Sequence, residues 1–250
     1  MSKKTRKSSR QNVEHRSGNV VHPVFEDTSW HPLGDEIDAQ RDKKFIRKIK
    51  PRSEGQQQLM EAIKEHNLTM AIGPAGTGKT YLAISAAVEA LEAGKVERII
   101  LSRPAMEAGE SLGYLPGDMH EKMAPYLRPL YDALGDRMGG KRVKQLLDDS
   151  TIEIAPVGFM RGRTLNNSFV VIDEAQNCTY GQLKMLLSRL GWHSTMVVTG
   201  DPDQTDLLDG MSGLSQIAEK LGSLPSIGVI KLGQSDIVRH PLVAEMLEVL

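Results

Sequence analysis

Short runs rich in β-branched residues alternate with amphipathic stretches along most of this chain. The runs predict strands at residues 68–72, 98–101, 151–154, 169–172, 196–199 and 228–232. Strands that are apolar throughout are typical of parallel sheets with helices packed on both faces. The pattern therefore predicts an α/β fold, with a mainly parallel sheet covered by helices on both of its faces.

Capping residues mark where several helices begin and end. Ser53 and Gln56 have the S-x-x-Q spacing of a capping box, and apolar residues then recur every three or four positions, which predicts a helix. Thr179 and Gln182 repeat this spacing ahead of a leucine-rich helix. A further helix is predicted at 79–93, since Gly94 follows it and glycine is common just past a helix end.

The stretch 104–150 is too long for an ordinary loop. Three prolines interrupt it, Pro116, Pro125 and Pro129. Between them and after them, large apolar residues recur at helical spacing: Met123, Tyr126, Leu127, Leu130, Tyr131 and Leu134. The simplest interpretation is an apolar helical hairpin that packs on the sheet and is broken at the prolines. A segment that contacts nucleic acid is the alternative, and the sequence does not decide between the two.

The composition changes this picture little, and it excludes some classes of protein. Of 250 residues, 40% are hydrophobic and 25% are charged, and no apolar run approaches the roughly 18 residues that a membrane-spanning helix needs. The single cysteine, Cys178, excludes an intrachain disulfide and a cysteine-rich zinc site. We expect a soluble protein of the reducing cytoplasm, with no membrane partner.

Charge is distributed unevenly along the chain, although the formal net charge is −1. Residues 1–50 hold 12 Lys and Arg against 7 Asp and Glu, and the first 18 residues contain almost nothing apolar. Such a segment gains too little from burial to become ordered. Two roles stay open for it: attraction of a nucleic-acid backbone, or a solvated tail that only aids solubility.

The strongest chemical signal is a G-x-x-x-x-G-K-T phosphate loop between the strand 68–72 and the helix 79–93. It consists of Gly73, Pro74, Ala75, Gly76, Thr77, Gly78, Lys79 and Thr80. The glycines allow backbone N–H groups to turn inward around a phosphate, at the positive end of a helix dipole. Lys79 is expected to neutralise the β- and γ-phosphates, and the Thr80 hydroxyl to reach Mg²⁺.

Two acids directly follow the apolar strand 169–172. Asp173 and Glu174 would reach the carboxyl edge of the sheet, where ligands bind in open α/β folds. We expect Asp173 to bind Mg²⁺ through water and Glu174 to orient and polarise the attacking water.

The strand 196–199 ends in the same manner, with Gly200 through Gln204. Gln204 is a candidate for a hydrogen bond to the γ-phosphate, which would couple hydrolysis to movement. A plain Gly-Asp-Pro turn is the alternative explanation.

These elements, with the residues around them, resemble the PhoH family of P-loop ATPases over about residues 51–250. The stretches that carry the resemblance are 73–83, 109–118, 161–167, 173–177, 200–207 and 236–241. The resemblance implies a RecA-like P-loop domain, similar to the first lobe of superfamily 1 helicases, with ATP and Mg²⁺ as cofactors. We therefore expect a basic N-terminal arm at 1–50, at least partly disordered, and an ATPase domain at 51–250.

The resemblance adds further site residues. Gln56 stands where helicase-like ATPases read the adenine edge, but its place in a capping box is an equally good explanation. Tyr81, next to the phosphate loop, joins the nucleotide-binding candidates. Arg239 resembles an arginine finger, with an ion pair as the alternative. Arg161 and Arg163 have three explanations: a finger, a nucleic-acid contact or an ion pair.

The resemblance finally implies ATP hydrolysis coupled to the binding or remodelling of RNA or single-stranded DNA, as in helicases. Candidate nucleic-acid contacts are Ser102, Arg103, Pro104 and Tyr114. Helicases that act as monomers need two RecA-like lobes. Because one lobe is evident here, we expect a homo-oligomer, for example a hexameric ring in which Arg239 enters a neighbour's site. The alternative is an ATP-driven conformational switch that acts on a protein partner without unwinding.

Overall fold

The computed structural model describes residues 49–104, 119–208, 210–238 and 246. Nearly all of the predicted basic arm, residues 1–50, lies outside these ranges, as do Tyr114 and Arg239. No helix within the described ranges is long and apolar enough to cross a bilayer.

A six-stranded parallel sheet forms the centre of the described structure. Its strands are β1 Leu68–Ile72, β2 Arg98–Arg103, β3 Ile152–Pro156, β4 Ser168–Ile172, β5 Thr195–Gly200 and β6 Gly228–Lys231. They lie in the order β3-β2-β4-β5-β1-β6, and every neighbouring pair is parallel. All six predicted strands are confirmed, and each observed strand begins or ends within two residues of its predicted bounds.

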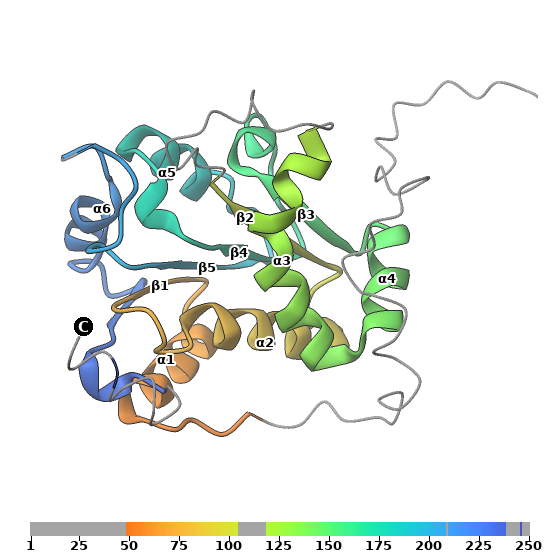
Figure 1. Ribbon diagram of the computed structural model, residues 1–250, viewed down its shortest axis with the longest axis horizontal. Coiled ribbons are helices and arrows are strands. Elements are labelled where there is room, and N and C mark those ends of the chain that lie inside the picture. The colour runs from red at the N-terminus through yellow and green to blue at the C-terminus, as the bar shows by residue number, and fades with distance from the viewer. Residues whose placement is uncertain (1–48, 105–118, 209, 239–245, 247–250) are drawn as a thin grey trace, which may run out of the picture.

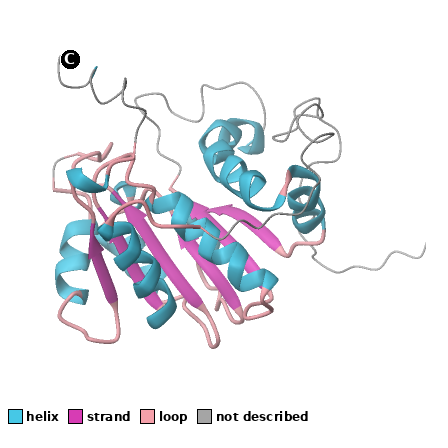
Figure 2. Ribbon diagram, turned by 90° about the horizontal axis from the view of Figure 1, so that it is seen from below, coloured by secondary structure: helices cyan, strands magenta, loops and turns pink. Residues whose placement is uncertain are grey.

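Helices cover both faces of the sheet. They are α1 Glu54–Glu65, α2 Lys79–Glu92, α3 Met119–Met138, α4 Gly140–Asp148, α5 Tyr180–Leu187 and α6 Leu214–Leu221, with short 3-10 turns η1 Val157–Met160, η2 Ala175–Asn177 and η3 Gln234–Asp236. Figure 1 shows α1 and α2 on one side of the strands and α5 on the other. Figure 2 shows the strands running side by side between the helices.

Alternate side chains of each strand enter opposite cores. Val171 packs with α1 to α4, whereas its neighbours Val170 and Ile172 pack with α5 and α6. This alternation explains why the strands are apolar throughout, since neither face of the sheet meets water. The phosphate-loop strand β1 is separated from the acid-bearing strand β4 by β5. The predicted α/β fold, a parallel sheet with helices on both faces, is confirmed, and its strand order agrees with the RecA-like architecture that the resemblance implies.

The two capping boxes differ in detail. Thr179 and Gln182 form both reciprocal hydrogen bonds, as expected. At α1, Ser53 Oγ accepts from the backbone N–H of Gln56 at 3.2 Å. The side-chain oxygen of Gln56, Oε1, accepts from the backbone N–H of Arg52 at 2.9 Å rather than from that of Ser53. The prediction of a full capping box at α1 is therefore wrong in its second half, because the Gln56 side chain has other partners.

The predicted helical hairpin corresponds to α3 and α4. Helix α3 packs on α2, with Leu130 and Leu134 fully buried. Pro125 and Pro129 lie within α3 and do not end it, contrary to expectation. A proline removes only its own N–H donor, and the burial of the neighbouring leucines stabilises the helix across the two missing bonds.

Asp236 joins the end of η3 to the beginning of α1. Its carboxylate accepts hydrogen bonds from the backbone N–H of Gly233 at 2.8 Å and of Gly55 at 3.1 Å. These backbone donors, that of Gly233 above all, and the Ser53 hydroxyl lower the pKa of Asp236, although burial opposes them. A side chain at position 55 would begin 2.5 Å from the carboxylate, so this close approach requires glycine.

We predict that Asp236→Asn lowers the free energy of unfolding by about 1–3 kcal/mol at neutral pH, because an amide N–H then faces a backbone donor. The pKa of Asp236 is lower when folded, so its stabilisation is complete above the ordinary value near 3.8 and is lost as the pH falls through the folded value. Urea denaturation at decreasing pH should show the two proteins converging. Asp132→Asn, on the exposed side of α3, is the control; an equal loss in both variants would contradict the prediction.

Cys178 lies fully buried in the core formed with α5 and α6. Burial raises the pKa of its thiol to about 12. Only the thiolate reacts with thiol-directed dyes, and burial keeps Cys178 protonated at mildly alkaline pH. We predict that such a dye leaves the native protein unlabelled and attaches one label per chain in denaturant. Rapid labelling of the native protein would show that this core opens locally.

Candidate functional site

The phosphate loop adopts a conformation that depends on its glycines. Gly73, Gly76 and Gly78 have φ angles of 149°, 85° and 82°, which other residues rarely adopt. A side chain at Gly73 would also collide with the backbone carbonyl of Leu232. The loop therefore turns tightly between β1 and α2, and Gly78 forms the N-cap of the helix.

Lys79 is buried, and its ammonium group lies within the loop. The Nζ atom donates to the carbonyl oxygens of Gly73 at 2.6 Å and of Pro74 at 2.8 Å. Burial lowers the pKa of Lys79, and the negative charges of Asp201, Glu174 and Asp173 act in the opposite direction. The Lys79 side chain thus lies in a cluster with three acids, and its hydrogen-bond partners are two neutral carbonyl groups and the Thr77 hydroxyl.

Asp173 connects three segments of the chain at the carboxyl edge of the sheet. Its Oδ1 atom accepts from the hydroxyl of Thr80 at 2.6 Å and from that of Thr199 at 2.7 Å, while Oδ2 lies 3.6 Å from Nη1 of Arg103. The structure brings together Thr80 and Asp173, the two residues predicted to bind metal. Hydroxyl and carboxylate oxygens are ligands that suit Mg²⁺, so the residues present fit this ion.

Glu174 follows with a left-handed backbone, φ 53° and ψ 42°. Such a conformation is uncommon outside glycine and is often found at functional sites. Its carboxylate accepts a short hydrogen bond from Nε2 of Gln176 and lies 3.4 Å from Nη2 of Arg103. The Glu174 side chain is 37% exposed, against 4% for that of Asp173, so it is the acid that solvent reaches.

The loop after β5 is attached to both the acids and the phosphate loop. Gln176 Oε1 accepts from the N–H of Asp201 at 3.0 Å, and its Nε2 donates to the carbonyl oxygen of Gln204 at 3.3 Å. The carboxylate of Asp201 accepts from the N–H of Ala75 at 3.2 Å. Gln204 thus lies at the predicted edge of the sheet, where its backbone carbonyl accepts from Gln176, and the residue is exposed to solvent.

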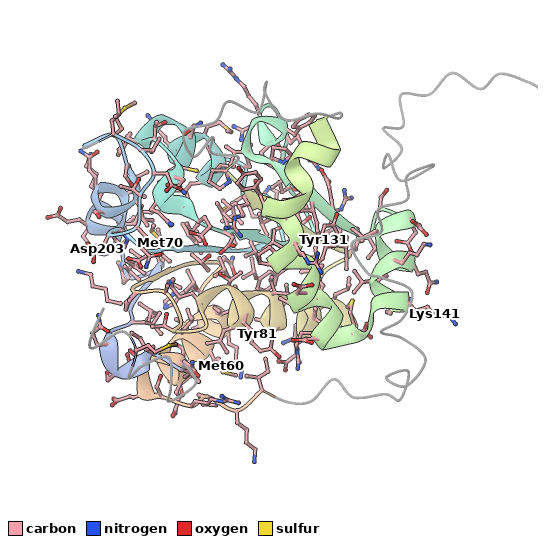
Figure 3. The ribbon with its side chains drawn as sticks, viewed as in Figure 1. Met60, Met70, Tyr81, Tyr131, Lys141 and Asp203 are labelled. Carbon is pink, nitrogen blue, oxygen red and sulfur yellow. The ribbon has the colours of Figure 1, made fainter. Side chains whose placement is uncertain are left out.

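Gln56 reaches the phosphate loop from α1. Its Nε2 donates to the carbonyl oxygen of Thr77 at 3.0 Å while its Oε1 accepts from Arg52, so both ends of the amide have protein partners. The residue is buried and lies against the loop, so its side chain does not complete the capping box, and its role at the adenine stays a prediction. Tyr81 lies on the first turn of α2, where Figure 3 labels it, and it is exposed.

Many protein families have a phosphate loop beside two acids at a strand end. Comparison with known proteins decides to which of these families the chain belongs. A family model described as PhoH-like protein matches residues 48–250. The chain belongs to the PhoH-like family. A PhoH-like protein of Bacillus subtilis (strain 168) is 53% identical over 201 residues, covering 80% of this chain and 63% of that protein. Protein PhoH of Escherichia coli (strain K12) is 44% identical over 209 residues, covering 82% of this chain and 59% of that protein.

This PhoH-like chain thus spans 63% and 59% of the length of those two curated relatives. Among solved structures, the large terminase from a thermophilic bacteriophage is similar with a TM-score of 0.49 and 11% identity. That match covers 80% of this chain and 50% of the terminase chain.

The arginines of the PhoH-like chain have different surroundings. Arg163 forms a two-pronged ion pair with Glu153, at 2.5 and 2.7 Å, and this hydrogen bonding raises the pKa of Arg163. Of its three predicted explanations, the structure shows the ion pair. Arg161 is exposed on the turn after η1. Arg239 lies outside the described residues, but Val238 before it donates its N–H to Gly76 of the phosphate loop at 2.9 Å.

Sequence reasoning missed four residues that contact the site. Arg103 was expected to be a nucleic-acid contact, while Gln176, Thr199 and Asp201 were given no role. All four stand at or just after the carboxyl ends of β2, β4 and β5. This position was the available signal, because parallel strands deliver their end residues to one edge of the sheet.

Proposed function

We propose that residues 51–250 form an ATPase domain that hydrolyses ATP with Mg²⁺. The observation that supports this most strongly is the hydrogen bond of Thr80 to Asp173, which joins the phosphate loop to the acid pair. Lys79 and Glu174 lie in the same charge cluster. Hydrolysis of a phosphoanhydride needs a site for phosphate, a site for metal and an acid that solvent reaches.

Each part has a distinct task in this proposal. The backbone N–H groups of the loop and the ammonium of Lys79 bind the β- and γ-phosphates. Thr80, and Asp173 through water, would hold Mg²⁺, and the ion would supply positive charge for the phosphate oxygens. Glu174 accepts a proton as the water oxygen bonds to the γ-phosphorus and the bond to the ADP oxygen breaks. Gln204 contacts the γ-phosphate, and Gln56 and Tyr81 line the nucleotide site.

We further propose that hydrolysis is coupled to RNA or single-stranded DNA. Support comes from the turn after β3, where Phe159 is 64% exposed and Arg161 is exposed two residues later. An exposed aromatic residue with an exposed cation two positions away in the sequence suits base stacking and phosphate contact. A homo-oligomer, such as a hexameric ring completed by Arg239, would supply the second lobe that unwinding requires. A switch that acts on a protein partner is the alternative proposal.

We predict that Glu174→Gln keeps ATP bound and lowers turnover by about 10²–10⁴-fold, the usual contribution of a general base. Lys79→Ala should instead weaken nucleotide binding itself, because it removes the positive charge that faces the phosphates. Phosphate release and equilibrium binding of a fluorescent ATP analogue separate the two effects.

The matched controls are Glu219→Gln on α6 and Lys141→Ala on α4, both exposed positions outside the site. They should leave binding and turnover unchanged. Unchanged turnover in Glu174→Gln would contradict the proposed role of Glu174 as proton acceptor. Unchanged nucleotide binding in Lys79→Ala would contradict the proposal that the phosphate loop binds the nucleotide.

We predict that single-stranded RNA or DNA raises the rate of phosphate release, and that Phe159→Ala and Arg161→Ala reduce this stimulation while the basal rate is kept. The stimulation should decline with added salt, because phosphate contacts release counterions. Phosphate release with and without each oligonucleotide is the measurement. A rate indifferent to both nucleic acids would favour the protein-directed switch.

A further inference from the structure

A single guanidinium group connects the two acids of the site. Arg103 is the last residue of β2, and the register pairs Ser102 with Ile172 of the neighbouring strand β4. The N–H of Asp173 then donates to the carbonyl oxygen of Ser102 at 2.8 Å, so the two strands stay paired up to the acids. Nη1 of Arg103 lies 3.6 Å from Asp173 Oδ2, and Nη2 lies 3.4 Å from Glu174 Oε1.

Every carboxylate oxygen of the acid pair has a protein partner in this arrangement. Asp173 Oδ1 accepts from two hydroxyls, and Glu174 Oε2 accepts from Gln176. Arg103 contacts the remaining oxygen of each acid. A metal ion that binds at Asp173 must therefore displace one of the partners of this carboxylate or share an oxygen with it.

The contacts of Arg103 are the ones most readily given up. They measure 3.4 and 3.6 Å, whereas the hydroxyl contacts to Asp173 measure 2.6 and 2.7 Å. The Arg103 side chain is 20% exposed, so its guanidinium can be hydrated after it moves. It is also a cation, and a divalent ion would compete with it for the same negative charge.

We propose that Arg103 is a positioning residue that competes with the divalent metal ion for Asp173 while it also contacts Glu174. It holds both carboxylates at the sheet edge and yields Asp173 Oδ2 when the metal and nucleotide bind. Arg103 thereby raises the Mg²⁺ concentration that is needed to half-saturate the site. This inference rests on the proposed function, because it requires that a metal–nucleotide complex binds beside Asp173.

The test is the Mg²⁺ dependence of binding of a fluorescent, non-hydrolysable ATP analogue to the full chain. Arg103→Gln removes the charge at similar length, and we expect the half-saturating Mg²⁺ concentration to fall about threefold to tenfold, since a half-buried ion pair contributes an effect of this order. Arg103→Lys keeps the charge but loses the two-pronged contact, so its half-saturation should lie between those of wild type and Arg103→Gln.

Arg163→Gln is the matched control, because it breaks another arginine–glutamate ion pair, that with Glu153. It should change thermal stability without changing the Mg²⁺ dependence. An unchanged or raised half-saturating concentration in Arg103→Gln and Arg103→Lys would overturn the inference. So would loss of analogue binding at every Mg²⁺ concentration in a folded variant, which would mark Arg103 as a direct nucleotide ligand. Failure of the wild type to bind the analogue at all would instead refute the proposed function itself.

Discussion

Asp173 accepts hydrogen bonds from Thr80 and Thr199, and these two contacts join the helix after the phosphate loop to the strands β4 and β5. Burial of a carboxylate is unfavourable unless its oxygens accept hydrogen bonds. Separation of α2 or β5 from the end of β4 would leave the Asp173 carboxylate without one of its partners, so this penalty favours keeping the three elements together. The positions of Lys79 and Glu174 depend on this junction. It fixes where the phosphate loop lies relative to the acids, and therefore where chemistry can occur.

Charge balance at the junction explains the other contacts. Burial lowers the pKa of Lys79, and the negative charges of Asp201, Glu174 and Asp173 partly offset this effect. Arg103 supplies a second cation on the neighbouring strand β2. A bound triphosphate would bring further negative charge into this cluster. The proposed Mg²⁺ would compensate for that charge, so binding of metal and of nucleotide should each favour the other.

Much of this arrangement is predictable from local sequence. The strands, the phosphate loop and the position of the acids follow from hydrophobic runs and from residues at strand ends. The contact of Gln56 with Thr77 depends on how α1 packs against the phosphate loop, which periodicity does not specify. The link from Arg103 to both acids depends on which strands are neighbours, and periodicity does not specify strand order. Pro125 within α3 was also missed, because burial of the helix outweighs its local preference. The roles assigned to Gln204, Arg239 and Tyr81 stay predictions.

The central claim is that a nucleoside triphosphate binds in the phosphate loop, next to the junction at Asp173. A crystal structure with a non-hydrolysable ATP analogue and Mg²⁺ tests it most directly. The account predicts that Lys79 Nζ leaves the carbonyl oxygens of Gly73 and Pro74 and contacts the β- and γ-phosphates, with Thr80 and Asp173 facing the metal. An analogue bound elsewhere, with Lys79 still hydrogen-bonded to those carbonyls, would contradict it.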